Sequence, residues 1–230
     1  MEYPKHIAFI PDGNRTWAKE HWLTSMEWHY AGFQRAIDLA RYLFEKTPVD
    51  VFTLWGLSTE NLKKRSESEL SYLFTLYENV TEALYDMMRK YQVNFRVAGD
   101  LSGLPQNLQD FLLQKQQAFT FDSPKVFVLA VNYGGQDEIL RGVKKLIDRG
   151  EEITKENLEK DMDFWNLPVV DLVIRTKQQF TKRLSGFMLW WIWYAQLYFT
   201  DLFCPDFTVD ELEKALIWWN STLDTQNFGK

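Results

Sequence analysis

The segment HIAFIPDGNR, residues 6–15, decides the fold, because a strand in it runs directly into a polar turn. Residues 6–10 carry β-branched and aromatic apolar side chains, a composition typical of a buried strand. Pro, Asp and Gly follow at positions 11–13 and favour a turn. The next two elements that the pattern predicts are a helix over Gly32–Glu45 and a strand over Val51–Leu57. A strand, a helix and a strand in this order form a crossover unit, so the two strands are expected to lie parallel.

The same alternation of short apolar runs and longer helical patterns continues to the end of the chain. Further strands are expected at residues 94–98, 125–132, 169–175 and near 197–200. Further helices are expected at residues 66–91, 105–118, 135–149 and 209–223, and through the Trp-rich segment before residue 197. Such connections place helices on both faces of a mostly parallel sheet. The sequence therefore predicts a three-layer α/β fold in a single domain over residues 1–230.

The composition is that of an ordinary globular protein and excludes several classes. Of the 230 residues, 46% are hydrophobic and 25% are charged, which argues against disorder. The net charge of -6 argues against nucleic acid as a partner. The lone Cys204 forbids an internal disulfide and the N-terminal residues lack the pattern of a secretory signal, so a cytoplasmic location is expected. The densest apolar run, Phe187–Phe199, is too short to span a bilayer.

Polar residues gather where three of the predicted strands end. The first strand runs into residues 11–15, the second into Ser58–Asn61 with basic residues 63–65 behind it, and the fifth into Arg175-Thr176 and then residues 182–185. Because the carboxyl ends of parallel strands meet at one edge of a sheet, these clusters are expected to share one rim. An acid, amides, hydroxyls and several basic side chains on an otherwise acidic chain favour a site for a phosphate ester with a divalent cation.

Each cluster on its own also has a structural interpretation. Asp-Gly-Asn is a common turn, Ser-Thr-Glu-Asn is typical of a helix cap, and adjacent basic residues are usually solvated charges. The coincidence of three clusters on one rim favours a functional site. The chain carries no Walker sequence, nucleophile elbow or dinucleotide-binding fingerprint, and its histidines lack the spacing of a zinc protease. A phosphohydrolase would explain the polar rim, but not the aromatic content of 16%.

Separated motifs occur along nearly the whole chain in a definite order. They are HIAFIPDGNRTWAK (6–19), His29 with Ala31-Gly32, LSTEN (57–61), NYGG (132–135), DLVIRT (171–176), RLSGF (183–187) and YAQLYFTDLFCPDF (194–207). In content and order these motifs resemble those of the cis-prenyltransferases, the family of undecaprenyl diphosphate synthase. The resemblance implies a six-stranded parallel sheet flanked by helices, and a homodimer.

The resemblance also implies an activity, a cofactor and substrates. The expected reaction is the Mg²⁺-dependent condensation of isopentenyl diphosphate with an allylic diphosphate of the farnesyl or geranylgeranyl type. Each addition forms a cis double bond and releases diphosphate, and the product is a polyprenyl diphosphate. Contact with a membrane is expected to be peripheral at most, through the lipid product.

Roles for individual residues follow from the same resemblance. Asp12, expected to hold the metal and to assist departure of the allylic diphosphate, and Asn61 are the expected catalytic residues. The residues expected to bind substrate are Gly13, Asn14, Arg15, Trp17, His29, Ser58, Arg65, Arg175, Arg183 and Ser185. Within this set, Arg175, Arg183 and Ser185 are assigned to the diphosphate of isopentenyl diphosphate. The apolar faces of the helices at 32–45 and 66–91 are expected to wall a tunnel for the growing chain.

The chain departs from the family pattern at position 196, where Gln196 stands in place of an acid that helps to hold Mg²⁺ in relatives, and this makes Gln196 a doubtful metal ligand. The segment between Arg175 and Arg183 is also two residues longer than the usual form, and residues 177–180 replace its glycines and glutamate. Two hypotheses follow: an active elongase, or a catalytically impaired homologue that acts as a binding or partner subunit. Retention of Asp12, Asn61 and the two arginines favours the enzyme.

Overall fold

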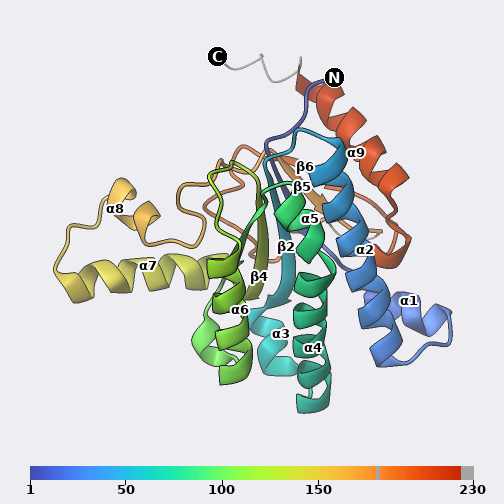
Figure 1. The fold of residues 1–230 in the computed structure, drawn as a ribbon, viewed down its shortest axis with the longest axis horizontal. Helices are drawn as coiled ribbons and strands as arrows, with labels where there is room; N and C mark the ends of the chain where they lie inside the picture. Colours follow the sequence, from blue (N-terminus) through green and yellow to red (C-terminus); the bar gives the residue numbers. More distant parts are fainter. Residues whose placement is uncertain (180–181, 224–230) are drawn as a thin grey trace.

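A six-stranded parallel sheet forms the centre of the computed structural model, which describes residues 1–179 and 182–223, apart from the side chains of residues 25, 26, 28 and 29 (Figure 1). The strands are β1 (His6–Ile10), β2 (Val51–Ser58), β3 (Asn94–Ala98), β4 (Val126–Tyr133), β5 (Leu172–Arg175) and β6 (Gln196–Phe199). Their order is β3-β4-β2-β1-β5-β6, with every pair parallel. The predicted fold class and the six strands are confirmed.

Helices cover both faces of the sheet because alternate residues of each strand point to opposite sides. In β1, Ile7 and Phe9 belong to one apolar cluster, and Ala8 and Ile10 belong to the other. The first cluster is completed by α2 (Ser25–Lys46), α4 (Glu67–Ala83), α5 (Tyr85–Lys90), α6 (Gln106–Ala118) and α9 (Val209–Thr222). The second is completed by α7 (Gly135–Arg149), α8 (Lys155–Lys160) and residues 187–192. The three layers are therefore those that the sequence predicts.

Two helices differ from their predicted bounds by more than one residue, and the strand expected over residues 169–175 begins at Leu172. The helix expected from Gly32 begins at Ser25, because Thr24 forms a capping box in which the backbone N–H of Thr24 donates to the Glu27 carboxylate at 2.8 Å. The helix expected over residues 66–91 is divided into α4 and α5 at Leu84. Helix α4 buries Leu73, Tyr77 and Val80, and α5 buries Met87 and Met88, so the apolar face that predicts one long helix is divided between them.

The helix expected through the Trp-rich segment is absent from the described part of the chain, and that prediction is wrong. Residues 185–191 form consecutive turns, closed by hydrogen bonds such as that from the Trp191 N–H to the Met188 carbonyl at 2.8 Å. Ser185, Gly186 and Met188 have positive φ angles, which a right-handed helix does not accommodate. The segment is apolar because Phe187, Met188 and Trp191 pack on the sheet, not because it is helical.

Short elements connect the strands to the polar edge of the sheet. Helix α1 (Asn14–Glu20) follows β1, and α3 (Thr59–Lys64) follows β2. The turns η1 (Leu101–Gly103) and η2 (Cys204–Asp206) follow β3 and β6. Within the described ranges, no helix is long and apolar enough to cross a membrane.

Candidate active site

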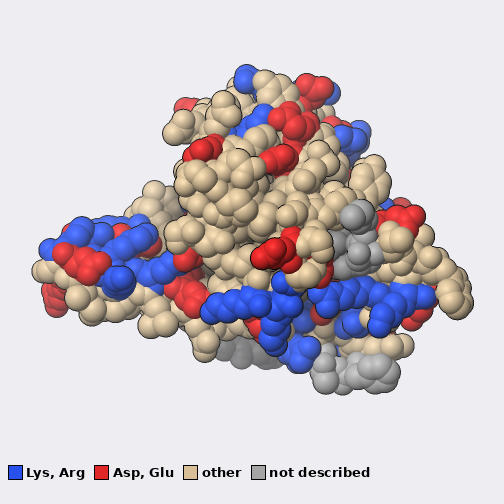
Figure 2. Space-filling model, turned by 90° about the horizontal axis from the view of Figure 1, so that it is seen from below, with Lys and Arg blue, Asp and Glu red and all other residues tan. Residues whose placement is uncertain are grey.

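A cavity of about 560 Å³ opens at the carboxyl ends of the central strands. In Figure 1, α3 marks the end of β2 on this lower side of the sheet. Each of the three polar clusters predicted from the sequence contributes to its lining. The lining residues from these clusters include Asp12, Gly13, Asn14, Arg15, Ser58, Glu60, Asn61, Arg65, Arg175, Arg183 and Ser185. Seen from below, Lys and Arg side chains gather across this face with acidic side chains between them (Figure 2). The expected common rim is therefore present, because the strands are parallel and adjacent.

Asp12 and Arg175 form an ion pair at the centre of this edge. Arg175 Nη2 donates to Asp12 Oδ2 at 2.9 Å, and the arginine side chain is only 5% exposed, whereas that of Asp12 is 37% exposed. Asp12 Oδ1 accepts from the backbone N–H of Gly13 at 2.7 Å. Thr176 Oγ1 accepts from the backbone N–H of Asp12 at 2.8 Å and donates to its carbonyl at 2.7 Å. These contacts fix the Asp12 carboxylate at the mouth of the cavity.

The segment after β5 folds back onto the same arginine. Arg175 Nη1 donates to the Arg183 carbonyl at 2.7 Å and to Ser185 Oγ at 2.9 Å. The buried Gln178 side chain accepts from the backbone N–H of Arg183 at 3.3 Å and donates to the Lys177 carbonyl at 2.9 Å. Arg175 therefore anchors residues 183–185, and the exposed Arg183 side chain lines the cavity.

Asn14 lines the cavity, and only one end of its side-chain amide is hydrogen-bonded within the described residues. Its Nδ2 donates to the Pro11 carbonyl at 3.2 Å, while its buried Oδ1 has no hydrogen-bond partner among the described residues. Gly32 of α2 packs directly on this amide, since a Cβ at position 32 would lie 2.7 Å from Oδ1. Only glycine permits this approach, and a buried acceptor without a partner is expensive unless a ligand uses it.

The β2 side of the cavity is built on the first turn of α3. Ser58 caps this helix, because its Oγ accepts from the backbone N–H of Asn61 at 3.0 Å. The cap leaves the Asn61 side chain exposed on the cavity wall. Arg15 and Arg65 both form ion pairs with Glu69 of α4, at 3.1 and 3.2 Å, and burial lowers the pKa of Arg65. Residues 58–61 therefore cap α3 and also line the cavity.

Apolar side chains form the inner end of the cavity. Phe33 and Ala36 of α2, Leu54 of β2 and Leu73 of α4 line it. Tyr77 packs beneath Gly56, and its buried hydroxyl has no hydrogen-bond partner within the described ranges. Burial raises the pKa of Tyr77 above its ordinary value.

The predicted tunnel is only partly open. Of the residues expected to face it, Phe33 and Leu73 reach the cavity. Ile37, Tyr77, Val80 and Leu84 are instead buried in the apolar core, at 6% exposure or less. The cavity therefore ends at Leu73 and Phe33, with Tyr77 packed against Phe33 behind them.

Two expected site residues that the structure describes, Gln196 and Trp17, do not line the cavity. Gln196 is the first residue of β6 and pairs with Leu172, whereas Arg175 pairs with Phe199 at the carboxyl edge. Gln196 thus lies three residues, or about 10 Å, back from the strand end, so one chain does not bring it to Asp12. Trp17 Nε1 donates to Asp206 Oδ1 at 2.9 Å and does not line the cavity. His29 lies in α2, but its side chain is outside the described part of the structure.

Other residues line the cavity without having been proposed from the sequence. Gly134–Asp137 follow β4, and Gly135 donates its backbone N–H to the Gly186 carbonyl at 2.9 Å. Their position directly after a buried strand, in the NYGG motif, was the available signal. Lys177 also lines the cavity. No sequence pattern pointed to Lys177, because its neighbours in space come from the turn after β1 and from the segment after β6.

Comparisons with known proteins follow the same motifs. The family described as "Putative undecaprenyl diphosphate synthase" matches residues 10–229. An isoprenyl transferase of Treponema denticola is 37% identical over 213 residues, which are 92% of each chain. A ditrans,polycis-undecaprenyl-diphosphate synthase ((2E,6E)-farnesyl-diphosphate specific) of Vibrio vulnificus is 33% identical, over 94% of this chain and 87% of the relative.

A solved structure matches the fold over nearly its full length. Lavandulyl diphosphate synthase from Lavandula x intermedia, in complex with dimethylallyl diphosphate, superimposes with a TM-score of 0.86. The two chains are 30% identical, and the match covers 94% of this chain and 95% of the other. Sequence and fold therefore point to the same group of proteins.

Proposed function

This chain belongs to the undecaprenyl diphosphate synthase family of isoprenyl transferases, and we propose that the cavity at the carboxyl edge of the sheet is where it elongates a cis-prenyl chain. One observation carries this proposal: a rim of cationic and polar side chains opens into an inner end of Phe33, Ala36, Leu54 and Leu73. The rim suits two diphosphates, and the apolar end suits a prenyl tail. The hypothesis of an impaired partner subunit is not favoured, because the relatives that match over most of the chain are transferases.

The substrates are isopentenyl diphosphate and an allylic diphosphate of the farnesyl or geranylgeranyl type. Arg183 and Ser185 hold the diphosphate of isopentenyl diphosphate, since Arg183 is exposed at the rim and Ser185 is positioned by Arg175. Gly13, Asn14 and Arg15 hold the allylic diphosphate beside Asp12. Asn61 lies in the first turn of α3, which Ser58 caps, and its side chain faces the reacting carbons. This division keeps each diphosphate on its own side of the Asp12–Arg175 pair.

The residues present fit a Mg²⁺ ion that is held mainly by substrate phosphates. Asp12 offers a partly exposed carboxylate at the cavity mouth, and Mg²⁺ in proteins is commonly bound through one or two carboxylates and the substrate's phosphates. Among the described residues, no group of three or more acidic, His or Cys side chains could hold an ion alone. A bound Mg²⁺ would neutralise charge on the departing diphosphate. Asp12 would position the departing diphosphate, and the buried Arg175 holds the Asp12 carboxylate in place through the hydrogen bond to its Oδ2.

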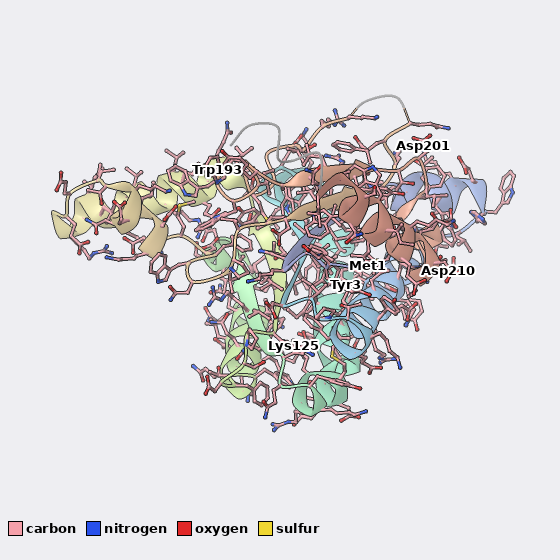
Figure 3. The ribbon with its side chains drawn as sticks, turned by 90° about the horizontal axis from the view of Figure 1, so that it is seen from above. Met1, Tyr3, Lys125, Trp193, Asp201 and Asp210 are labelled. Atoms are coloured by element: carbon pink, nitrogen blue, oxygen red, sulfur yellow. The ribbon has the colours of Figure 1, made fainter. Side chains whose placement is uncertain are left out.

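We also propose a homodimer that forms through the β6 edge of the sheet. β6 pairs with β5 on one side and with no other described strand on the other. Trp193 and Tyr194 precede it and are 67% and 75% exposed, with ring centroids 4.2 Å apart. Trp193 is labelled in Figure 3. Exposed aromatic side chains beside an open strand edge suit burial against another protein. Tyr194→Asp is expected to shift the sedimentation coefficient from that of a dimer to that of a monomer.

The proposed enzyme works in the cytoplasm and meets a membrane only through its lipid product. A reducing compartment agrees with the single buried Cys204, whose burial raises the pKa of the thiol.

The test is direct synthesis with purified protein. The protein is incubated with labelled isopentenyl diphosphate, Mg²⁺ and, in turn, dimethylallyl, farnesyl and geranylgeranyl diphosphate, and both the prenyl product and free diphosphate are measured. Elongated product with stoichiometric diphosphate supports the proposal. Phosphate release without elongation would support a phosphohydrolase instead. Product that forms only when a second protein is added would support the partner subunit.

A further inference from the structure

Lys177 lies at the rim of the cavity directly beside the Asp12–Gly13 turn. Its Cβ is 3.0 Å from the position that a Cβ would occupy on Gly13. The side chain is exposed and lines the cavity. Residue 177 therefore stands where a diphosphate held by Asp12 and Gly13 would meet the segment after β5.

The backbone of Lys177 is fixed on both sides. Its N–H donates to the Leu202 carbonyl at 2.8 Å, and its own carbonyl accepts from Gln178 Nε2 at 2.9 Å. The next N–H, that of Gln178, donates to the Thr200 carbonyl at 3.0 Å. These bonds hold the Cα–Cβ direction of Lys177 toward the cavity mouth.

The conformation at this position is one that glycine adopts more easily than lysine. The φ angle of Lys177 is 54°, in the left-handed region. Unfavourable backbone conformations of this kind gather at functional sites, where the side chain has a use that offsets its cost. A lysine at a cavity mouth, in a conformation suited to glycine, is thus a candidate for function.

The charges around the cavity make this lysine distinctive. The lining cations of the described chain are Arg15, Arg65, Arg175, Lys177 and Arg183. Arg15 and Arg65 pair with Glu69, and Arg175 pairs with Asp12. The charge of Arg183 acts on Glu60, whose pKa it helps to lower after the larger effect of Lys64. In the part of the chain that the structure covers, Lys177 has no acidic side chain within 4.0 Å, so its charge is available to a ligand.

We propose that Lys177 is a further diphosphate-binding residue of this enzyme, which holds the diphosphate beside Asp12 and reduces the need for Mg²⁺. The inference rests on the proposed function of the cavity. An ammonium group carried by this fixed backbone neutralises part of the charge that a divalent cation would otherwise neutralise. Such help matters in a chain whose second candidate metal ligand, Gln196, lies back from the strand end.

Binding of inorganic diphosphate by calorimetry tests this assignment without relying on turnover. Wild type, Lys177→Met and Lys182→Met are compared in EDTA and in saturating Mg²⁺. Lys182 is the matched control, because it is an exposed lysine of the same loop that does not line the cavity. In EDTA, Lys177→Met is expected to weaken binding about tenfold, the loss typical of one charge-assisted hydrogen bond. Saturating Mg²⁺ is expected to shrink this loss, and Lys182→Met is expected to bind within about twofold of wild type.

Lys177→Gly separates binding from folding. Glycine fits the positive φ angle, so this variant is expected to melt at or above the wild-type temperature while it shows the same loss of diphosphate binding. Equal affinities for Lys177→Met and Lys182→Met would overturn the assignment. So would a loss in Lys177→Met that Lys177→Gly does not share. If wild type itself bound no diphosphate in either buffer, the proposed function of the cavity would fail along with it.

Discussion

Arg175 Nη2 donates to Asp12 Oδ2 across 2.9 Å, and this single pair joins the ends of β1 and β5 at the centre of the cavity. The arginine is buried and also holds the Arg183 carbonyl and Ser185 Oγ. Asp12 therefore has two tasks, because it faces the ligand and neutralises a buried guanidinium. Variants of either residue are expected to affect both catalysis and stability.

Asp12→Ala is expected to abolish turnover, with a loss of about a thousandfold, because it removes the carboxylate nearest the departing diphosphate. It leaves Arg175 without its acidic partner, so the free energy of unfolding should also fall by about 1 to 3 kcal/mol. Asp12→Asn is the control: its amide oxygen can still accept from Arg175, so it should recover stability but not activity. Steady-state rates and urea unfolding measure the two effects. An active Asp12→Asn would contradict the role of the charge.

Arg183→Ala is expected to raise the KM for isopentenyl diphosphate by about tenfold or more, because one charged contact to its diphosphate is lost. The Arg183 side chain is exposed, so the melting temperature should hardly change. Arg175→Ala should raise the same KM but also lower the melting temperature, since it releases the loop. An equal rise in the KM of the allylic substrate with Arg183→Ala would show that the two diphosphates are assigned to the wrong sides.

Leu73→Ala is expected to lengthen the prenyl product, because Leu73 closes the inner end of the cavity. Leu84→Ala is the matched control, since Leu84 is equally buried but does not line the cavity. Both should lose about 2 to 5 kcal/mol of stability, the usual cost of this core substitution. Product lengths by chromatography separate them. The same product distribution from Leu73→Ala and wild type would mean that Leu73 is ordinary core.

His6 is expected to stay neutral to about pH 4. Its buried ring projects from β1, with Nδ1 donating to the Pro168 carbonyl at 2.8 Å and Nε2 hydrogen-bonded to Thr53 Oγ1 of β2 at 2.8 Å. Burial lowers the pKa of His6 to about 4. Proton NMR titration measures this directly, and a midpoint near 6.5 would contradict it.

The lowered pKa of His6 also predicts a pH dependence of stability. Between pH 6.5 and about 4 the unfolded chain binds a proton that the folded chain does not, so stability falls as pH falls through this window. The full effect is about 3 kcal/mol. His6→Asn, which can keep a donor to Pro168, should lose less stability than wild type between pH 7 and pH 5. Glu138 also contributes to the pH dependence of stability, because burial raises its pKa to about 7. Since Glu138 is present in both wild type and His6→Asn, its contribution cancels when the two proteins are compared.

The sequence alone determined the layered α/β fold and the edge of the sheet that carries the site. Both depend on local patterns: apolar strands, helical periodicity, and polar residues directly after Ile10, Leu57 and Ile174. Parallel crossovers then leave few arrangements, and all of them bring these strand ends to one edge.

Only the tertiary structure decided which residues meet at that edge. The register of β6 sets Gln196 back from Asp12, and positive φ angles turn the Trp-rich segment away from the predicted helix. Lys177 lies against Gly13 although 163 other positions separate them in the chain. Contacts of this kind depend on strand register and packing between distant segments, and a local pattern carries no information about either.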